Sequence, residues 1–261
     1  MSTSVSVNLN AVAVLRNRRN LPWPNLVHIG KIALQSGASG LTVHPRPDQR
    51  HIRYTDLPEI RRLIDEQFPK AELNIEGYPN ETFLNLCERY KPEQITLVPD
   101  DPHQLTSDHG WDFLQNQALL TKTVARLHNL GSRISLFADG NGNEHSLQAA
   151  KLTGADCIEL YTGPYGACYN NPQQERIFLN KLAITAQLAQ KMDLQINAGH
   201  DLTIQNIPNL INAIPYISEI SVGHAFAATA LECGVKEAVF CFRRACGQHL
   251  DNTKRLTHPV K

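Results

Sequence analysis

Residues 71–99 read AELNIEGYPNETFLNLCERYKPEQITLVP, and this stretch contains one complete strand–helix–strand unit. The apolar runs at 71–76 and 94–99 are typical of short buried strands. Between them, residues 80–90 place apolar side chains three and four positions apart, which is the spacing of an amphipathic helix. Asn80, with Glu81 in the first turn, is typical of a helix start. A strand, a helix and a second strand in this order predict a parallel pair in an α/β fold.

The same unit repeats along the whole chain. Further helical patterns lie at 56–68 and 115–130, and Gly131 and Gly154 stand where helix C-caps are expected. Eight such units in 261 residues predict a single domain over residues 1–261, a (β/α)8 barrel with parallel strands. A doubly wound sheet would usually need fewer strands. The predicted strands are 5–10, 40–44, 71–76, 94–99, 133–139, 157–163, 194–200 and 217–224.

Composition and charge exclude several classes of protein. The chain has 42% apolar and 19% charged residues, which predicts a folded globular protein rather than a disordered or fibrous one. Its 25 basic and 25 acidic residues give zero net charge, which speaks against broad binding of nucleic acid or of an anionic membrane. The six cysteines form no CxxC pair, and the N-terminus lacks the pattern of a signal peptide. We therefore expect a cytoplasmic protein with reduced thiols and no membrane span.

Polar side chains stand at the ends of most predicted strands, where a buried parallel strand should be apolar. In a closed barrel these positions converge on one mouth, the face that carries the active site of barrel enzymes. A single histidine or glutamate at a strand end is usually a packing residue, but such residues on five separate strands favour a catalytic site. The strand-end residues are Asn8, Asn10, His44, Glu76, Asp139, Glu159, Asn197, His200 and His224.

Two features of this mouth suggest phosphate binding. Glycines before His200 and His224, in the loops after the last two strands, leave backbone N–H groups accessible, although they could also serve only tight turns. Arg46 lies in a stiff His-Pro-Arg-Pro segment, and its planar guanidinium suits phosphate. Arg16, Arg18 and Arg19 form a second basic cluster, or else a solvated helix start.

Two other patterns carry less weight. The segment from Gly140 to Gly142 resembles the start of a dinucleotide-binding motif, but its third glycine is missing. The loop from Asp100 to His109 is rich in Asp and His, yet its spacing fits no metal-binding pattern, and we expect a solvated acidic loop. No metal and no cofactor are expected.

Seven motifs in order resemble the pyridoxine 5′-phosphate synthase family of vitamin B6 biosynthesis, over residues 7 to about 245. They are SVNLNAVAVLRNRR (6–19), LTVHPRPDQRHI (41–52), LNIEG (73–77), LVPDDPHQLTSDHGWD (97–112), IELYTG (158–163), INAGHDLT (196–203) and VGHA (222–225). The resemblance implies a barrel with extra short helices that assembles as a homo-octamer. It also implies a transferase-type, ring-closing synthase. Such an enzyme condenses 3-amino-2-oxopropyl phosphate with 1-deoxy-D-xylulose 5-phosphate, releasing phosphate and water.

The resemblance also assigns residue roles. His44 matches a catalytic acid/base, Glu76 a second proton acceptor, Glu159 a residue of proton handling and His200 the proton donor. These residue types suit repeated proton transfers near neutral pH, because the pKa of His lies close to 7 and a site can raise that of Glu.

Eight further positions match substrate-binding residues of the family. Asn8 and Arg19 match contacts to the amino-ketone phosphate, whereas Arg46 and His51 match contacts to the xylulose phosphate. The remaining four are Thr106 on the loop 100–113, a candidate lid, with Asp201, Gly223 and His224 at the last two strand ends.

The chain departs from the family at two places. Well-known members have Asp-His where this chain has Asn10-Ala11, and they usually have Gly at the position of Asp201, which could bind through its backbone alone. Two alternatives therefore stay open, namely a non-catalytic phosphate-binding paralogue and another phosphosugar barrel enzyme. A Schiff-base aldolase is disfavoured, because no lysine occupies a predicted strand.

Overall fold

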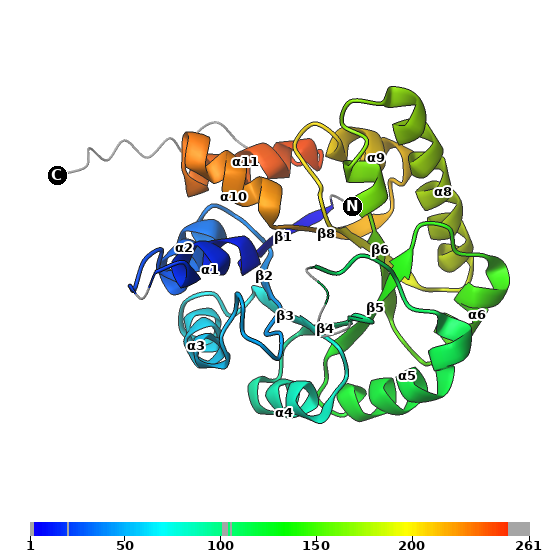
Figure 1. The fold of residues 1–261 in the computed structure, drawn as a ribbon, viewed down its shortest axis with the longest axis horizontal. Coiled ribbons are helices and arrows are strands. Elements are labelled where there is room, and N and C mark those ends of the chain that lie inside the picture. Colours follow the sequence, from blue (N-terminus) through cyan, green and yellow to red (C-terminus); the bar gives the residue numbers. More distant parts are fainter. Residues whose placement is uncertain (1–2, 20, 101–103, 105, 250–261) are drawn as a thin grey trace.

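A closed, all-parallel barrel forms the centre of the molecule (Figure 1). The computed structural model describes residues 3–19, 21–100, 104 and 106–249. Each strand pairs with the next in chain order, and β8 pairs with β1, which confirms the predicted (β/α)8 barrel. The strands are β1 (Ser4–Asn8), β2 (Gly40–Val43), β3 (Glu72–Gly77), β4 (Gln94–Leu97), β5 (Arg133–Asp139), β6 (Cys157–Tyr161), β7 (Gln195–Gly199) and β8 (Ile217–Val222).

Helices surround the barrel (Figure 1). Some connections carry an additional helix: α1 and α2 both lie between β1 and β2, and α7 and α8 both lie between β6 and β7. The helices are α1 (Asn10–Asn17), α2 (Leu26–Gln35), the 3-10 turn η1 (Tyr54–Asp56), α3 (Leu57–Gln67), α4 (Glu81–Tyr90), α5 (Phe113–His128), α6 (Glu144–Leu152), α7 (Gly163–Gly166), α8 (Pro172–Lys191), α9 (Ile207–Ala213), α10 (His224–Cys233) and α11 (Val235–Ala245). Across the described residues, no helix combines the length and the hydropathy that a membrane span requires.

The expected helix ends are present. The side chain of Asn80 caps α4 by accepting a hydrogen bond from the backbone N–H of Phe83 at 2.9 Å. Gly131 and Gly154 have φ values of 81° and 87°, the left-handed conformation that glycine adopts without cost after a helix.

Three predicted strands reach too far, into the helix that follows. The strand predicted at 157–163 ends at Tyr161, and α7 begins at Gly163. The strand predicted at 217–224 ends at Val222, and α10 begins at His224.

The third case is at the start of the chain. The first strand was expected to reach Asn10, but β1 ends at Asn8 and Asn10 begins α1. The chain turns at Leu9, which has helical backbone angles, and the Asn10 N–H donates to the side-chain oxygen of Asn8 at 2.9 Å. Both asparagines therefore remain at the mouth of the barrel, on two different elements.

The interior of the barrel is polar, whereas barrel interiors usually hold bulky branched side chains. Hydrogen bonds join side chains of neighbouring and opposite strands. Ser6 contacts Thr42 at 2.7 Å, and the Gln94 amide donates to the Glu219 carboxylate at 3.0 Å. Apolar strand residues such as Leu73 are fully buried and belong to the hydrophobic core. Polar and apolar residues thus alternate along the strands. This alternation is unusual for a parallel sheet that is buried on both faces.

Candidate active site

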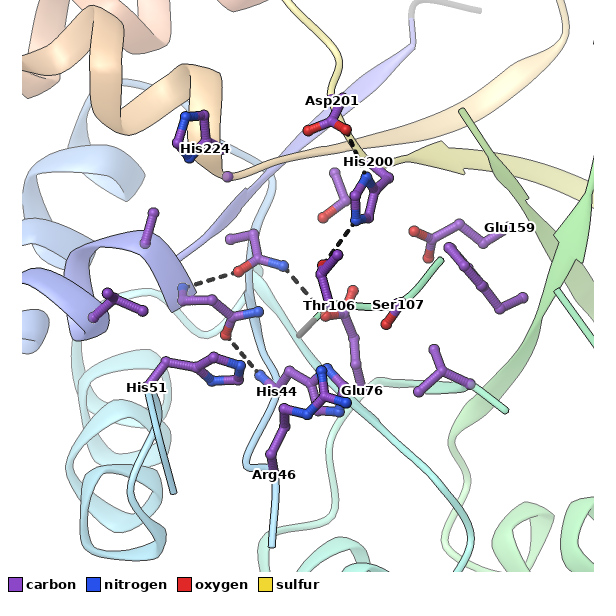
Figure 2. A pocket seen from close by; sticks show the side chains of 18 residues that line it. His44, Arg46, His51, Glu76, Thr106, Ser107, Glu159, His200, Asp201 and His224 are labelled. Atoms are coloured by element: carbon purple, nitrogen blue, oxygen red, sulfur yellow. Dashed lines mark hydrogen bonds and ion pairs between the residues drawn. The ribbon is translucent and has the colours of Figure 1, made fainter. Parts of the chain in front are cut away.

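A cavity of about 450 Å³ opens at the carboxyl end of the barrel (Figure 2). Its walls come from strand ends and from the loops that follow them, so residues far apart in the sequence meet there. The lining residues are Asn8, Asn10, Ala11, Val14, His44, Arg46, His51, Glu76, Val98, Thr106, Ser107, Phe137, Glu159, His200, Asp201, Ser221, Gly223 and His224.

This cavity brings together eleven of the twelve residues predicted for the site. The exception is Arg19, which is exposed beyond α1 and does not line the cavity. Within the same basic cluster, Arg16 is buried and binds both carboxylate oxygens of Asp56, at 2.6 and 2.9 Å. Arg16 therefore holds α1 against the segment before α3.

A chain of hydrogen bonds positions the side chains around β1. The Asn8 amide donates to a carboxylate oxygen of Glu76 at 3.2 Å, and the Asn10 side-chain oxygen accepts the backbone N–H of His44 at 2.9 Å (Figure 2). The two asparagines thus connect the ends of β1, β2 and β3. Asn10 has a structural role here, because its side-chain oxygen holds the backbone N–H of His44.

Two buried histidines, His44 and His51, lie side by side with ring centroids 5.6 Å apart. Burial lowers the pKa of His44 well below its ordinary value, and His51 and Arg46 lower it further. Burial, with Arg46 and Arg50, also lowers the pKa of His51 to about 4. Both rings are therefore uncharged near neutral pH, and an uncharged imidazole can accept a proton.

Asp100 corrects the expectation of a solvated acidic loop. Its side chain is buried, and its Oδ2 lies 3.1 Å from the Arg46 guanidinium and accepts the Ser107 hydroxyl at 2.9 Å. Asp101 and His103 of the same loop lie outside the described residues. A loop with alternating acids is usually solvated, and the sequence pattern did not indicate that its first carboxylate folds onto Arg46.

Two buried glutamates lie deep in the mouth. Burial raises the pKa of Glu76 to about 7, and Asp100 contributes in the same direction. Burial, then Glu76 and Glu219, raises the pKa of Glu159 well above its ordinary value. Glu76 can thus gain or lose a proton near neutral pH, which an ordinary surface glutamate cannot, and burial favours the neutral form of Glu159.

The opposite wall is formed by the ends of β7 and β8. Nε2 of His200 lies 3.0 Å from the hydroxyl oxygen of Thr106, so the loop after β4 reaches across to β7. Gly223 is the N-cap of α10, and a side chain there would lie 3.3 Å from Cβ of Asn8. The first turn of α10, with its free N–H groups, faces the cavity at His224, and such a turn is a ready anion site.

Sequence reasoning missed five lining residues, which carry no distinctive chemistry and line the cavity only because of the fold: Val14, Val98, Ser107, Phe137 and Ser221. Asp139 was expected at the mouth, but its carboxylate accepts the backbone N–H of Gly110 at 2.8 Å instead. Among the described residues, no group of three or more His, Cys, Asp or Glu is placed to hold a metal ion.

Comparisons with known proteins identify the family of the chain. The chain matches the family described as "Pyridoxal phosphate biosynthesis protein PdxJ" over residues 5–248. It is 60% identical to the pyridoxine 5′-phosphate synthase of Allorhizobium ampelinum over 248 residues, covering 95% of this chain and 99% of that protein. It is 58% identical to the enzyme of the same name from Rhizobium meliloti, with the same coverage.

Solved structures of low sequence identity share the fold. A tryptophan synthase alpha chain from Legionella pneumophila superimposes with a TM-score of 0.64 at 13% identity, covering 94% of this chain and 92% of that one. A 3-keto-L-gulonate-6-phosphate decarboxylase from Vibrio cholerae gives 0.63 at 9% identity, covering 95% and 98%. The fold is thus common to several enzymes, whereas the match over residues 5–248 is specific: the chain belongs to the family of the pyridoxal phosphate biosynthesis protein PdxJ.

Proposed function

We propose that this chain is a pyridoxine 5′-phosphate synthase, an enzyme that closes the pyridine ring from 3-amino-2-oxopropyl phosphate and 1-deoxy-D-xylulose 5-phosphate. The observation that carries the proposal is the meeting of Glu76, His44 and His200 in one cavity. Relatives of 58–60% identity that bear this name support it. The reaction class is that of a transferase, and it releases phosphate and water.

Proton transfer is assigned to four residues. His44, uncharged near neutral pH, accepts a proton from the substrates, and Glu76 is a second acceptor with a pKa near the working pH. His200 donates a proton from the opposite wall. Glu159, buried within the barrel beneath the mouth, takes part in proton handling.

Two anion sites are assigned to opposite walls. Arg46 and His51 bind the xylulose phosphate, because a guanidinium can donate two parallel hydrogen bonds to phosphate oxygens. Gly223 and His224, at the first turn of α10, bind the phosphate of the product through backbone N–H groups. Asn8 contacts the amino-ketone phosphate.

Three assignments complete the proposal. Thr106 binds the substrate from the loop after β4. Arg19, which does not line the cavity of this chain, binds the amino-ketone phosphate with Asn8. We infer a homo-octamer in the cytoplasm from the resemblance to the family. The proposed partners are small phosphorylated substrates, with no nucleic acid and no membrane.

The test is to incubate the purified protein with both substrates and follow the absorbance of the pyridine product. We expect the chromophore only when both substrates are present. If a phosphosugar is converted in the absence of the amino-ketone, the chain is another phosphosugar barrel enzyme. Tight binding of both phosphates without any turnover would identify a phosphate-binding paralogue.

A further inference from the structure

His200 and Asp201, adjacent residues at the carboxyl end of β7, form a side-chain pair that the roles above do not use. Nδ1 of His200 lies 3.1 Å from Oδ2 of Asp201, while Nε2 of the same ring faces Thr106 at 3.0 Å (Figure 2). We propose that Asp201 is a positioning residue that fixes the orientation and tautomer of His200 for proton transfer. This inference rests on the proposed function only for the identity of the reaction.

The chemistry of the pair defines the tautomer. An ionised carboxylate only accepts hydrogen bonds, so Nδ1 of His200 must carry a proton. The hydrogen bond from His200 lowers the pKa of Asp201, which keeps this carboxyl group ionised near neutral pH. Nε2 is then the nitrogen that gains and loses the exchangeable proton, and it is the one that points toward Thr106 and the cavity.

The backbone of the pair is held in an unusual conformation. His200 and Asp201 have φ values of 86° and 54°, in the left-handed region that side chains seldom adopt. Neighbouring groups clamp both residues: the Thr162 hydroxyl donates to the His200 carbonyl, and the Asn206 amide donates to the Asp201 carbonyl at 3.2 Å. Strained residues that are held in this way concentrate at functional sites.

Close packing of the α7 turn supports the same geometry. A side chain at Gly166 would come within 2.5 Å of the Asp201 carbonyl oxygen and 2.6 Å of its Cβ, so only glycine lets this turn approach. Tyr161 packs edge-on against the His200 ring, with centroids 5.2 Å apart and an interplanar angle of 80°. The ring is therefore restricted on one face by Tyr161 and at Nδ1 by the carboxylate.

Other ionisable groups also face the pair. Glu76 on β3 interacts electrostatically with His200, Tyr161 on β6 contacts its ring, and His224 on α10 interacts with Asp201. Substitution of Asp201 alone leaves these three groups in place. A change in the kinetics or in the ring tautomer of such a variant therefore reports the Asp201 carboxylate.

The chain offers a matched control for Asp201. Asp193 has the same residue type and almost the same backbone angle, φ 56°, but it lies between α8 and β7 and does not line the cavity. Asp201→Asn and Asp193→Asn therefore remove the same charge from the same conformation. Asparagine also tolerates the left-handed region, so we expect both variants to fold with thermal midpoints within about 2 °C of wild type.

Kinetics separate positioning from substrate binding. We expect Asp201→Asn to lower kcat by about tenfold or more, with KM changed less than about threefold, and Asp193→Asn to leave both unchanged. A rise in KM with an unchanged kcat would instead mean that Asp201 binds substrate directly, and would overturn the proposal.

A spectroscopic test does not depend on the reaction. NMR of 15N-histidine-labelled protein without ligand reports which ring nitrogen is protonated, with His200→Asn assigning the signals. We expect the neutral His200 ring to carry its proton on Nδ1 in the wild type and in Asp193→Asn, and to lose this preference in Asp201→Asn. A wild-type ring protonated on Nε2 alone would overturn the proposal, even if the chain proves to be an active synthase. Conversely, a chain without synthase activity could still show the expected tautomer.

Discussion

Burial determines the chemical character of the individual residues at the mouth. Glu76 is buried, and its pKa of about 7 lies far above that of an exposed glutamate. The same burial, with nearby arginines, keeps His44 and His51 uncharged. One cavity thus holds a carboxyl group that titrates near neutral pH next to imidazoles that can accept protons.

Replacing Glu76 by Gln tests this assignment. We expect Glu76→Gln to lower kcat by about 10²–10⁴, the usual worth of a general acid or base, with ligand affinities changed only a few-fold. The Gln side-chain oxygen can still accept the Asn8 amide that now binds Glu76 at 3.2 Å. Turnover and calorimetric titration of each substrate measure the two quantities separately. Turnover close to wild type would remove Glu76 from the mechanism.

The Asn10-Ala11 departure leads to a second prediction. Asn10 accepts the His44 backbone N–H at 2.9 Å, and a carboxylate at this position could accept it equally well. We therefore expect the double variant Asn10→Asp, Ala11→His to keep kcat and to lower KM for the xylulose phosphate, or to leave it unchanged. Steady-state kinetics on both proteins decide this. An inactive native chain beside an active double variant would mean that the departure abolishes catalysis.

At this scale the sequence predicted residue types well and contacts poorly. Polar residues at strand ends identified His44, Glu76 and His200, because such residues are out of place in a buried parallel sheet. Burial of Asp100 against Arg46 could not be predicted, since it depends on how the loop folds back. The family's binding role for Arg19 stays a prediction.

Among the elements, the loop after β4 is held to the barrel by the residues at its C-terminal end, Gly110 and Trp111. The Gly110 N–H donates to the Asp139 carboxylate at 2.8 Å, and Trp111 donates through its backbone to the Phe137 carbonyl and through its ring to the Leu97 carbonyl. These bonds fix the loop to β4 and β5 only a few residues beyond Thr106. The anchor therefore sets how the loop reaches the cavity.

Gly110→Ala should displace this loop. A Cβ at this position would lie 2.3 Å from the Asp139 backbone nitrogen, and a backbone clash cannot be relieved by rotating a side chain. We expect kcat/KM to fall by about tenfold or more while circular dichroism stays that of the wild type, because a misplacement of about 1 Å can cost a hundredfold. Asp139→Asn, which keeps an acceptor oxygen, serves as the control and should remain active. Wild-type activity of Gly110→Ala would show that the position of the loop does not matter.

Elements themselves were largely predictable. All eight strands were located from short apolar runs, and Asn80, Gly131 and Gly154 marked helix ends because each has a specific backbone role. The boundary at Asn10 was wrong, since an apolar run does not reveal that a helix follows the strand after a single residue. Boundaries set by one turn of backbone leave little trace in the residue pattern.

Across the whole molecule, the polar barrel interior couples stability to pH. Glu219 is buried, and burial raises its pKa to about 7, with a further contribution from Glu72. A carboxyl group whose pKa is higher in the folded than in the unfolded state favours folding when it is protonated. Its contribution is complete below the unfolded pKa of about 4.5 and is lost as the pH rises through 7.

Glu219→Gln should therefore change the pH dependence of stability. The variant stays neutral, and its side-chain oxygen can still accept the Gln94 amide that now lies at 3.0 Å. Relative to wild type, we expect a gain in the free energy of unfolding that grows from near zero at about pH 4.5 toward about 3 kcal/mol at about pH 8. Denaturant titrations at several pH values measure this difference. A constant difference at every pH would show that Glu219 is not the titrating group.

The fold as a whole followed from repetition, since eight strand–helix units permit few arrangements other than a barrel. The polar interior of the barrel was not predicted from the sequence, although Asn74 and Glu76 alternate with apolar neighbours there. Only the closed sheet shows which alternate positions face inward. The single domain, the octamer and the cytoplasmic location stay predictions.

The central claim is that one cavity binds two phosphorylated substrates and joins them, keeping one phosphate and releasing the other. The most direct measurement is the stoichiometry of the reaction, with pyridoxine 5′-phosphate quantified by mass spectrometry and inorganic phosphate by a coupled assay. The account predicts one phosphate released for each pyridoxine 5′-phosphate formed, and neither product from either substrate alone. Phosphate release without the pyridine product, or from a single substrate, would contradict it.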